Sequence, residues 1–275
     1  MAERTIAAQD VTLAVSDDGE GPAIVLLHGL SASRRYVVMG SQALQRAGHR
    51  VVAYDARGHG ASSPAPAPHL YGYEELAADL LAVLDELGIE RAVLAGVSMG
   101  AHTILRLALH RPERVGALAV ITPAYDPVDF DDPRRLAHWD ALSDALREGG
   151  IDAFVQAYGV QRLPEAWRDT IATVMRQRLE LHEHPGAVAD ALHVTPRSRP
   201  FEDLHSLEEI EIPAVVVASR DEADPGHPLA IGEAYAELLP QARLFVEEPG
   251  SSPLAWQGGR VSKIIAELAA RAGES

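Results

Sequence analysis

A serine between two glycines, in the segment GVSMG at positions 96–100, constrains the fold of this chain more than any other feature. It follows the apolar run 92–95 and precedes the helix-like segment 101–108. We expect a sharp strand-to-helix turn that lifts Ser98 clear of a sheet, with glycines where side chains would collide with the backbone. Such a turn presents the Ser98 hydroxyl as a nucleophile and aims the Met99 amide at a developing oxyanion.

Composition bounds the class of protein. The chain has 275 residues, 47% of them hydrophobic, which is enough to bury a large core as one domain with an inserted part. The formal charge of −16 argues against binding to nucleic acid or to anionic membrane surfaces. The sequence contains no cysteine, which excludes disulfides, thiolate metal sites and cysteine nucleophiles.

The cell compartment follows from two further observations. The first residues lack a basic segment followed by an apolar one, so we expect no secretory signal. No apolar run has the length of a membrane span. The sequence therefore predicts a cytoplasmic protein with a small-molecule substrate and with no nucleic-acid or membrane partner, and it leaves a homodimer open.

Apolar runs alternate with helical periodicity over most of the chain. The expected strands are 11–15, 23–27, 50–54, 92–95, 117–121, 213–218 and 242–246, and the expected helices are 40–47, 73–88, 101–108, 228–239 and 260–271. We expect strands 11–15 and 23–27 to form an antiparallel hairpin across the turn-rich segment between them. The alternation predicts an α/β fold with a mainly parallel, twisted sheet covered by helices on both faces.

The pattern becomes entirely helical between residues 123 and 207. Candidate helices are 133–148, 151–158, 165–183 and 187–192. This block interrupts the sheet at the carboxyl ends of the strands, where open α/β sheets bind ligands, so we expect it to form a lid. The predicted organisation is a core of residues 1–122 and 208–275 with a helical insertion at 123–207.

Several segments together resemble the α/β-hydrolase family, over nearly all of the chain outside the insertion. They are His28-Gly29-Leu30, DARGHGAS at 55–62, the Ser98 turn, RPERV at 111–115 and DPGHP at 224–228. The resemblance implies an α/β-hydrolase fold and cofactor-free hydrolysis of a small ester, a lactone or a related acyl or carbon–carbon substrate. It places the Leu30 amide opposite the Met99 amide as the second oxyanion donor, in a segment shaped by His28 and Gly29.

The acid of a catalytic triad has two candidates, three residues apart. Counting forward from the end of strand 213–218 leads to Asp221, whereas counting back from the following helix leads to Asp224. The family pattern Asp-Pro-x-x-Pro favours Asp224. The other carboxylate would then be a solvated loop residue or a helix-start residue.

The chain departs from the family at the base. Members of the family supply a histidine from the loop after the last strand, but that position maps here onto Ser251 or Ser252, and no histidine follows His227. Neither serine accepts a proton at neutral pH. Without an imidazole, Ser98 keeps its ordinary high pKa and the acid has nothing to orient.

Three explanations of the missing base stay open. A histidine from elsewhere substitutes, either His227 beside the acid loop or one of the histidines near the insertion, which are His182, His184, His193 and His205. Alternatively, the fold serves a lyase, cyclisation or rearrangement that needs positioning but no acyl-enzyme. In the third case the chain is inactive, either as a ligand-binding protein or because its base has been replaced.

Other histidines of the sequence suit structural roles. His227 also suits a polar cap of the helix that follows it, and His102 is expected to pack under the helix after Ser98. The histidines of the segment HEH at 182–184 point in different directions on a helix, so we expect an exposed turn and no metal site.

Overall fold

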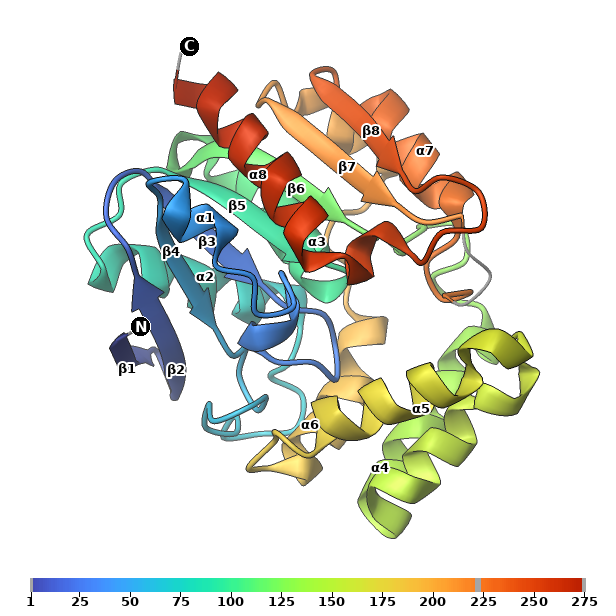
Figure 1. Ribbon diagram of the computed structural model, residues 1–275. Coiled ribbons are helices and arrows are strands. Elements are labelled where there is room, and N and C mark those ends of the chain that lie inside the picture. The colour runs from blue at the N-terminus through green and yellow to red at the C-terminus, as the bar shows by residue number, and fades with distance from the viewer. Residues whose placement is uncertain (1, 221–223, 274–275) are drawn as a thin grey trace.

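One eight-stranded sheet runs through the computed structural model, which describes residues 2–220 and 224–273 (Figure 1). Its order is β1-β2-β4-β3-β5-β6-β7-β8, β3 to β8 are mutually parallel, and β2 runs antiparallel to both of its neighbours, β1 and β4. The strands are β1 (Ala2–Ala8), β2 (Val11–Asp18), β3 (Ala23–Leu27), β4 (Arg50–Tyr54), β5 (Ala92–Val97), β6 (Val115–Ile121), β7 (Ala214–Ala218) and β8 (Ala242–Val246). The predicted α/β class with a mainly parallel sheet is confirmed.

The predicted hairpin between strands 11–15 and 23–27 is wrong. β2 pairs with β1, and the two strands β2 and β3 lie on opposite sides of β4. The turn between β2 and β3 passes under the loop before β4: a Cβ on Gly19 would lie 2.4 Å from the His49 carbonyl oxygen, and one on Gly21 would lie 2.4 Å from that of Gly48. The glycines therefore let the chain cross beneath β4 instead of reversing beside β2.

Helices cover both faces of the sheet, as expected for apolar parallel strands. Figure 1 shows α1 (Ala43–Arg46) and α8 (Gly258–Gly273) on one face, and α2 (Tyr73–Glu86), α3 (Met99–His110) and α7 (Leu229–Leu238) on the other. Two separate apolar clusters of buried residues form beneath these two layers. Among the described residues, none of the helices has both the length and the apolar composition needed to cross a membrane.

The stretch between β6 and β7 contains α4 (Pro133–Tyr158), α5 (Glu165–Leu179) and α6 (Pro185–Val194). The separate helices expected at 133–148 and 151–158 are both present within α4, and they meet at Gly150, whose φ of 67° and ψ of −155° are not helical. Glycine is the residue that tolerates this conformation, so the first helix ends there and the second begins in a new direction. Short 3₁₀ helices cover Arg34–Tyr36, Pro112–Arg114, Val160–Arg162, Thr195–Arg197, Leu204–Glu209 and Leu254–Trp256.

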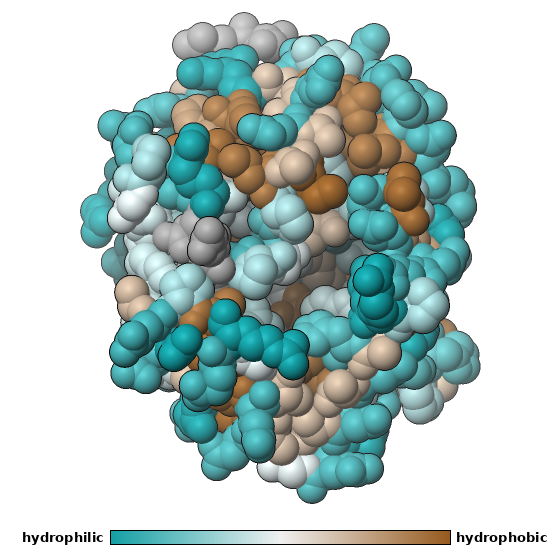
Figure 2. Space-filling model, turned by 90° about the vertical axis from the view of Figure 1, so that its right-hand side faces the viewer, coloured by the Kyte–Doolittle hydropathy of each residue, from teal (hydrophilic) through white to brown (hydrophobic). Residues whose placement is uncertain are grey.

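This helical insertion lies next to the carboxyl ends of the central strands (Figure 1). It has apolar clusters of its own, and Leu30 of the core packs against one of them. Figure 2 shows a hollow between the core and the insertion, with apolar surface at its base. The insertion thus covers the edge of the sheet at which ligands bind in open α/β folds.

Candidate active site

Ser98 lies on a strained turn between β5 and α3. Its backbone has φ 50° and ψ −109°, a region that non-glycine residues rarely occupy. A Cβ on Gly96 would lie 2.3 Å from the Gly100 carbonyl, and one on Gly100 would lie 2.4 Å from the Leu27 carbonyl oxygen. The two glycines therefore allow strand, turn and helix to approach closely enough to hold Ser98 in this conformation.

The segment that follows β3 lies against Ser98. A Cβ on Gly29 would lie 3.4 Å from the Ser98 Cβ, and half-buried Leu30 packs against the cluster that contains Met99. In the described part of the chain, neither the Leu30 nor the Met99 amide donates a hydrogen bond. Two free amides beside a serine suit the stabilisation of an oxyanion.

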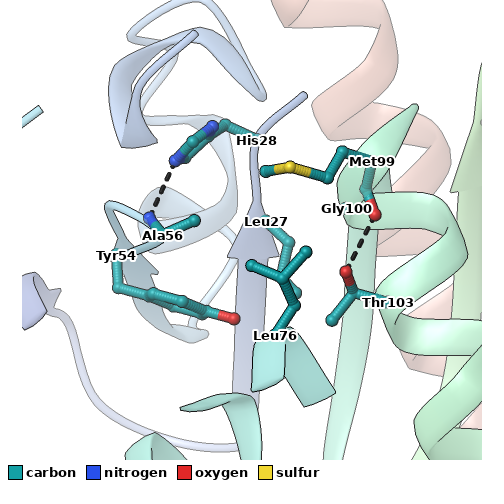
Figure 3. A pocket seen from close by; sticks show the side chains of 8 residues that line it. All are labelled: Leu27, His28, Tyr54, Ala56, Leu76, Met99, Gly100 and Thr103. Atoms are coloured by element: carbon teal, nitrogen blue, oxygen red, sulfur yellow. Dashed lines mark hydrogen bonds between the residues drawn. The ribbon is translucent and has the colours of Figure 1, made fainter. Parts of the chain in front are cut away.

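His28 uses both of its ring nitrogens within the core. Its Nδ1–H donates to the Gly29 carbonyl at 2.8 Å, and its Nε2 accepts the Ala56 amide at 2.9 Å (Figure 3). Burial lowers the pKa of His28 to about 4, so the ring is neutral at pH 7. His28 therefore orders the segment after β3 and takes no part in proton transfer.

A small cavity lies beneath the Ser98 turn. Figure 3 shows side chains that converge on it from the end of β3, from β4, from α2 and from the first turn of α3. Its volume is about 10 Å³, which is the size of a single water molecule. The cavity is too small for a substrate, and a larger hollow opens at the surface between the core and the insertion (Figure 2).

His102 is committed to structure as well. Its Nε2 accepts the amides of Ala124 and Tyr125, each at 3.1 Å, and its Nδ1–H donates to the Tyr73 hydroxyl at 3.0 Å. Burial lowers the pKa of His102 to about 3. As expected, His102 packs behind the Ser98 turn and takes no part in proton transfer.

The expectation that residues 182–184 form an exposed turn is wrong for His182. This side chain is buried: its Nδ1 accepts the Gly60 amide at 2.8 Å, and its Nε2–H donates to the Ser31 carbonyl at 3.2 Å. The chain after α5 folds back over the loop that carries Gly60, where the Glu183 amide donates to the Gly60 carbonyl. His182 thus fastens the insertion to the core.

The remaining candidate histidines are exposed, and none of them contacts Ser98 through a hydrogen bond in the described residues. His193 is exposed and pairs with Asp140, and His205 is exposed and pairs with Glu208. His184 is exposed before α6. Within residues 2–220 and 224–273, no cluster of histidine and acidic side chains is suited to holding a metal ion.

His227 forms a pair with Asp224. The His227 Nδ1 lies 2.8 Å from the Asp224 Oδ1, and both side chains are largely buried in the loop between β7 and α7. The capping alternative does not describe His227, because Pro228 is the N-cap of α7 and no side chain caps that helix. Asp221, the other acid candidate, lies outside the described residues.

Opposing effects set the pKa values of this pair. Burial favours the neutral form of each group, but the mutual attraction and hydrogen bond outweigh burial, so the pKa of Asp224 is lowered and that of His227 is raised. The His227 charge lowers the pKa of His102, which lies one turn after Ser98. The pair therefore interacts electrostatically with the first turn of α3, although no imidazole in the described residues is hydrogen-bonded to the Ser98 hydroxyl.

The loop after β8 holds serines where the family places its histidine. The Ser251 amide donates to the Glu248 carbonyl at 3.0 Å, and the Gln257 side chain donates to the Ser252 carbonyl at 2.6 Å. Ser251 and Ser252 are both half-buried. Further along this loop, Trp256 stacks edge-on against Trp167 of α5, with ring centroids 5.8 Å apart.

Sequence reasoning missed Glu247. This buried carboxylate accepts hydrogen bonds from the Ser219 hydroxyl at 2.8 Å and from the amides of Arg220 and Leu254. Burial acts to raise the pKa of Glu247, but these donors outweigh burial and lower it. The signal was a glutamate directly after an apolar strand, and its role is to tie the loop after β7 to the loop after β8.

Comparisons with known proteins identify the family. Residues 22–258 match the family model of the alpha/beta hydrolase fold, and the chain belongs to the α/β-hydrolase family. It is 32% identical over 232 residues to the "Putative carbamate hydrolase RutD" of Pseudomonas savastanoi pv. phaseolicola, covering 84% of this chain and 86% of that protein. It is 28% identical over 249 residues to 3-oxoadipate enol-lactonase 2 of Acinetobacter baylyi, covering 89% and 88%.

A solved structure agrees with these sequence matches. The thermophilic esterase from Thermogutta terrifontis superposes with a TM-score of 0.82 and 25% identity, over 99% of each chain. These three proteins are named as a carbamate hydrolase, an enol-lactonase and an esterase. Their shared features support hydrolase activity for this chain.

Proposed function

We propose that this protein is a serine hydrolase that cleaves a small ester, a lactone or a related acyl or carbon–carbon substrate without a cofactor. The observation that carries the proposal is the strained backbone of Ser98, held at φ 50° in front of α3 by two glycines that cannot carry a side chain. Relatives named carbamate hydrolase, enol-lactonase and esterase agree with this reaction class.

The chemistry divides among a few groups. Ser98 attacks the substrate carbonyl, and the amides of Leu30 and Met99 hold the oxyanion that forms. His227 takes the proton from Ser98 and returns it to the leaving group, while Asp224 orients the imidazole and stabilises its charged form. The helical insertion acts as a lid that excludes water from the hollow.

In this proposal, a movement of the loop between β7 and α7 brings His227 to Ser98. Hydrogen bonds in catalytic sites are often long without substrate and tighten when it binds. Burial raises the pKa of Tyr158 at the end of α4, and the negative charge of Asp224 adds to this effect, so the acid loop interacts electrostatically with the insertion. Closure of the insertion on a substrate would therefore move the loop that carries Asp224 and His227.

A fluorophosphonate probe tests the nucleophile. We expect one adduct at Ser98 by mass spectrometry, none in Ser98→Ala, and unchanged labelling in the control Ser206→Ala. His227→Gln should lower kcat for a 4-nitrophenyl ester by about 10²- to 10⁴-fold, which is the usual contribution of a general base. Absence of an adduct in the wild-type protein would overturn the proposal, and a loss of less than about threefold in His227→Gln would remove His227 from it.

The alternative is a member of the fold that does not hydrolyse its ligand. It is favoured by one observation, the serines at 251 and 252 where the family has its histidine. A lyase, cyclase or rearrangement catalyst would keep most of its turnover in Ser98→Ala. A binding protein would show a ligand-dependent rise in Tm and release no product.

A further inference from the structure

Arg178 is the positively charged group of this site that the proposed hydrolysis does not use. It extends from the last turn of α5, and its guanidinium carbon lies 5.1 Å from the centre of the Tyr36 ring. Tyr36 belongs to the segment that follows Leu30, so the contact joins the insertion to the side of the site that holds the oxyanion donors. A cation over an aromatic face is attracted by the ring but makes no hydrogen bond with it.

The guanidinium lacks the partners that a shielded arginine normally has. Its Nε is shielded from solvent and has no hydrogen-bond partner, and no carboxylate of the described residues forms an ion pair with Arg178. By contrast, Arg57 in the core is fully buried and makes two 2.7 Å bonds to Asp79. An arginine donor that is shielded and unpaired costs free energy unless a ligand fills it.

The electrostatic influence of Arg178 places it amid the catalytic groups. Its charge lowers the pKa of Asp224 and of His227 on one side and the pKa of His28 on the other. Burial lowers the pKa of Arg178, and the nearby Asp224 carboxylate partly offsets that effect. The contact with Tyr36 places the guanidinium beside the segment that follows the oxyanion donors, and its influence on Asp224 and His227 agrees with a position near the loop that carries the acid.

We propose that Arg178 binds a carboxylate of the substrate, so that the preferred substrate is an ester or lactone that carries a second, ionised carboxyl group. This inference rests on the proposed hydrolase function and names its substrate class. The Nε and one Nη of a guanidinium match the two oxygens of a carboxylate in a paired geometry. Because the chain has a net charge of −16, a shielded cation is what an anionic substrate needs in order to enter this hollow.

Two substrates that differ only in one carboxylate charge test the proposed role of Arg178. The 4-nitrophenyl monoesters of linear dicarboxylic acids with six to eight carbons are compared with the same compounds whose free carboxyl group is methylated. We expect kcat/KM of the wild-type protein to favour the ionised member by about tenfold or more at the best chain length. The ratio of the two values is the readout, because it cancels any effect of Arg178 on the pKa of His227.

Arg178→Met should reduce the ratio of kcat/KM for the ionised substrate to that for the methylated one by about tenfold to a hundredfold, mainly through KM. Arg178→Lys should retain part of this ratio, because lysine keeps the charge but lacks the planar guanidinium. Arg176→Met is the matched control: Arg176 lies on the same helix, is exposed and pairs with Asp152, so its ratio should equal that of the wild type. A wild-type ratio near one, or an unchanged ratio in Arg178→Met, would overturn the inference.

A binding measurement separates this inference from the proposed hydrolysis. Calorimetric titration of Ser98→Ala with the free dicarboxylates should show binding that disappears in Ser98→Ala/Arg178→Met and persists in Ser98→Ala/Arg176→Met. Circular dichroism confirms that each variant is folded, and Arg178→Gln, which also removes the charge, replaces Arg178→Met if the latter is not. Binding without ester hydrolysis would refute the proposed function alone, whereas hydrolysis at Ser98 without Arg178-dependent binding would refute the carboxylate site alone.

Discussion

The Asp224 carboxylate and the His227 imidazole, three positions apart in one loop, are joined by a 2.8 Å hydrogen bond, and a proline follows each of them. Proline restricts the backbone of the residue before it and fixes its own φ. The loop from 224 to 228 therefore loses little conformational freedom when it forms the pair. This local rigidity lets a short loop outside any helix or strand hold an acid and a base together.

The first prediction concerns the pH dependence of activity. A base acts in its neutral form, and the pKa of His227 is raised, so kcat/KM for an ester should rise with pH through a limb above pH 6.5. Asp224→Asn removes the charge that raises this pKa and leaves burial to lower it. The limb should then move to lower pH while kcat falls, which a pH–rate profile of the two proteins measures.

If His227 is the titrating group, the pH at which kcat/KM rises must depend on Asp224. If the profiles of wild type and Asp224→Asn share one limb, the titrating group is not His227. A limb well below pH 6.5 in the wild type would contradict the raised pKa.

The second prediction concerns the turn at Ser98. In Gly100→Ala, the new Cβ would lie 2.4 Å from the Leu27 carbonyl oxygen, which is backbone at the end of a central strand and cannot move aside. We expect a loss of roughly 3 kcal/mol or more in the free energy of unfolding, measured by urea denaturation. Any folded fraction should also lose probe labelling, because the turn carries the nucleophile.

Gly259→Ala provides the control for this substitution. Gly259 lies in the first turn of α8, and a Cβ there meets no atom within 4 Å. Alanine favours helix over glycine, so this variant should be neutral or slightly stabilised. Similar losses in both variants would show that the close approach at Gly100 is not what sets the cost.

The third prediction concerns stability in acid. Burial holds the pKa of His28 at about 4 and that of His102 at about 3, while an unfolded histidine titrates near 6.5. Below pH 6.5 the unfolded chain therefore binds more protons than the folded one, so stability is full above 6.5 and falls as pH drops toward these lower values. Each group contributes on the order of a few kcal/mol over this range.

His102→Gln tests the share of one residue. Glutamine offers a carbonyl oxygen to the amides that His102 accepts, and it does not titrate. The variant should be less stable at neutral pH but should lose less stability between pH 6.5 and 4 than the wild type. Parallel curves of unfolding free energy against pH would show that His102 does not titrate on unfolding.

Features set by neighbouring residues could be predicted from the sequence. The Ser98 turn follows from two glycines, an apolar strand before them and a helical pattern after them. The parallel sheet follows from apolar runs separated by helices. In both cases the deciding interactions are steric clashes and burial within a short stretch of chain.

Features set by distant contacts could not be predicted. The partner of β2 depends on where the chain crosses β4, because an alternating strand pairs equally well with several neighbours. His182 resembles an exposed turn until the insertion folds back onto Gly60, which is 122 positions away along the chain. The unpaired Nε of Arg178 and the buried carboxylate of Glu247 likewise result from tertiary packing that no local pattern records.

The fourth prediction concerns the tie between two loops. Glu247→Gln replaces one acceptor oxygen by an NH₂ donor, which would face donors such as the Ser219 hydroxyl or the amides of Arg220 and Leu254. We expect a loss of about 1–3 kcal/mol in unfolding free energy, as for a buried group left without its partner. Because Ser219 and Arg220 begin the loop that ends in the Asp224–His227 pair, kcat should fall as well.

Glu248→Gln is the matched control. Glu248 is the next residue and its side chain is exposed, so the same chemical change there should alter neither the unfolding free energy nor kcat. Stability alone cannot separate a positioning role from a structural one, so the pH–rate profile is the deciding readout. If Glu247 positions the pair, Glu247→Gln weakens the hold of Asp224 on His227 and moves the acid limb of kcat/KM to lower pH. A variant that is less stable but keeps the wild-type limb and kcat would show that Glu247 only holds the loops together and that the pair forms without it.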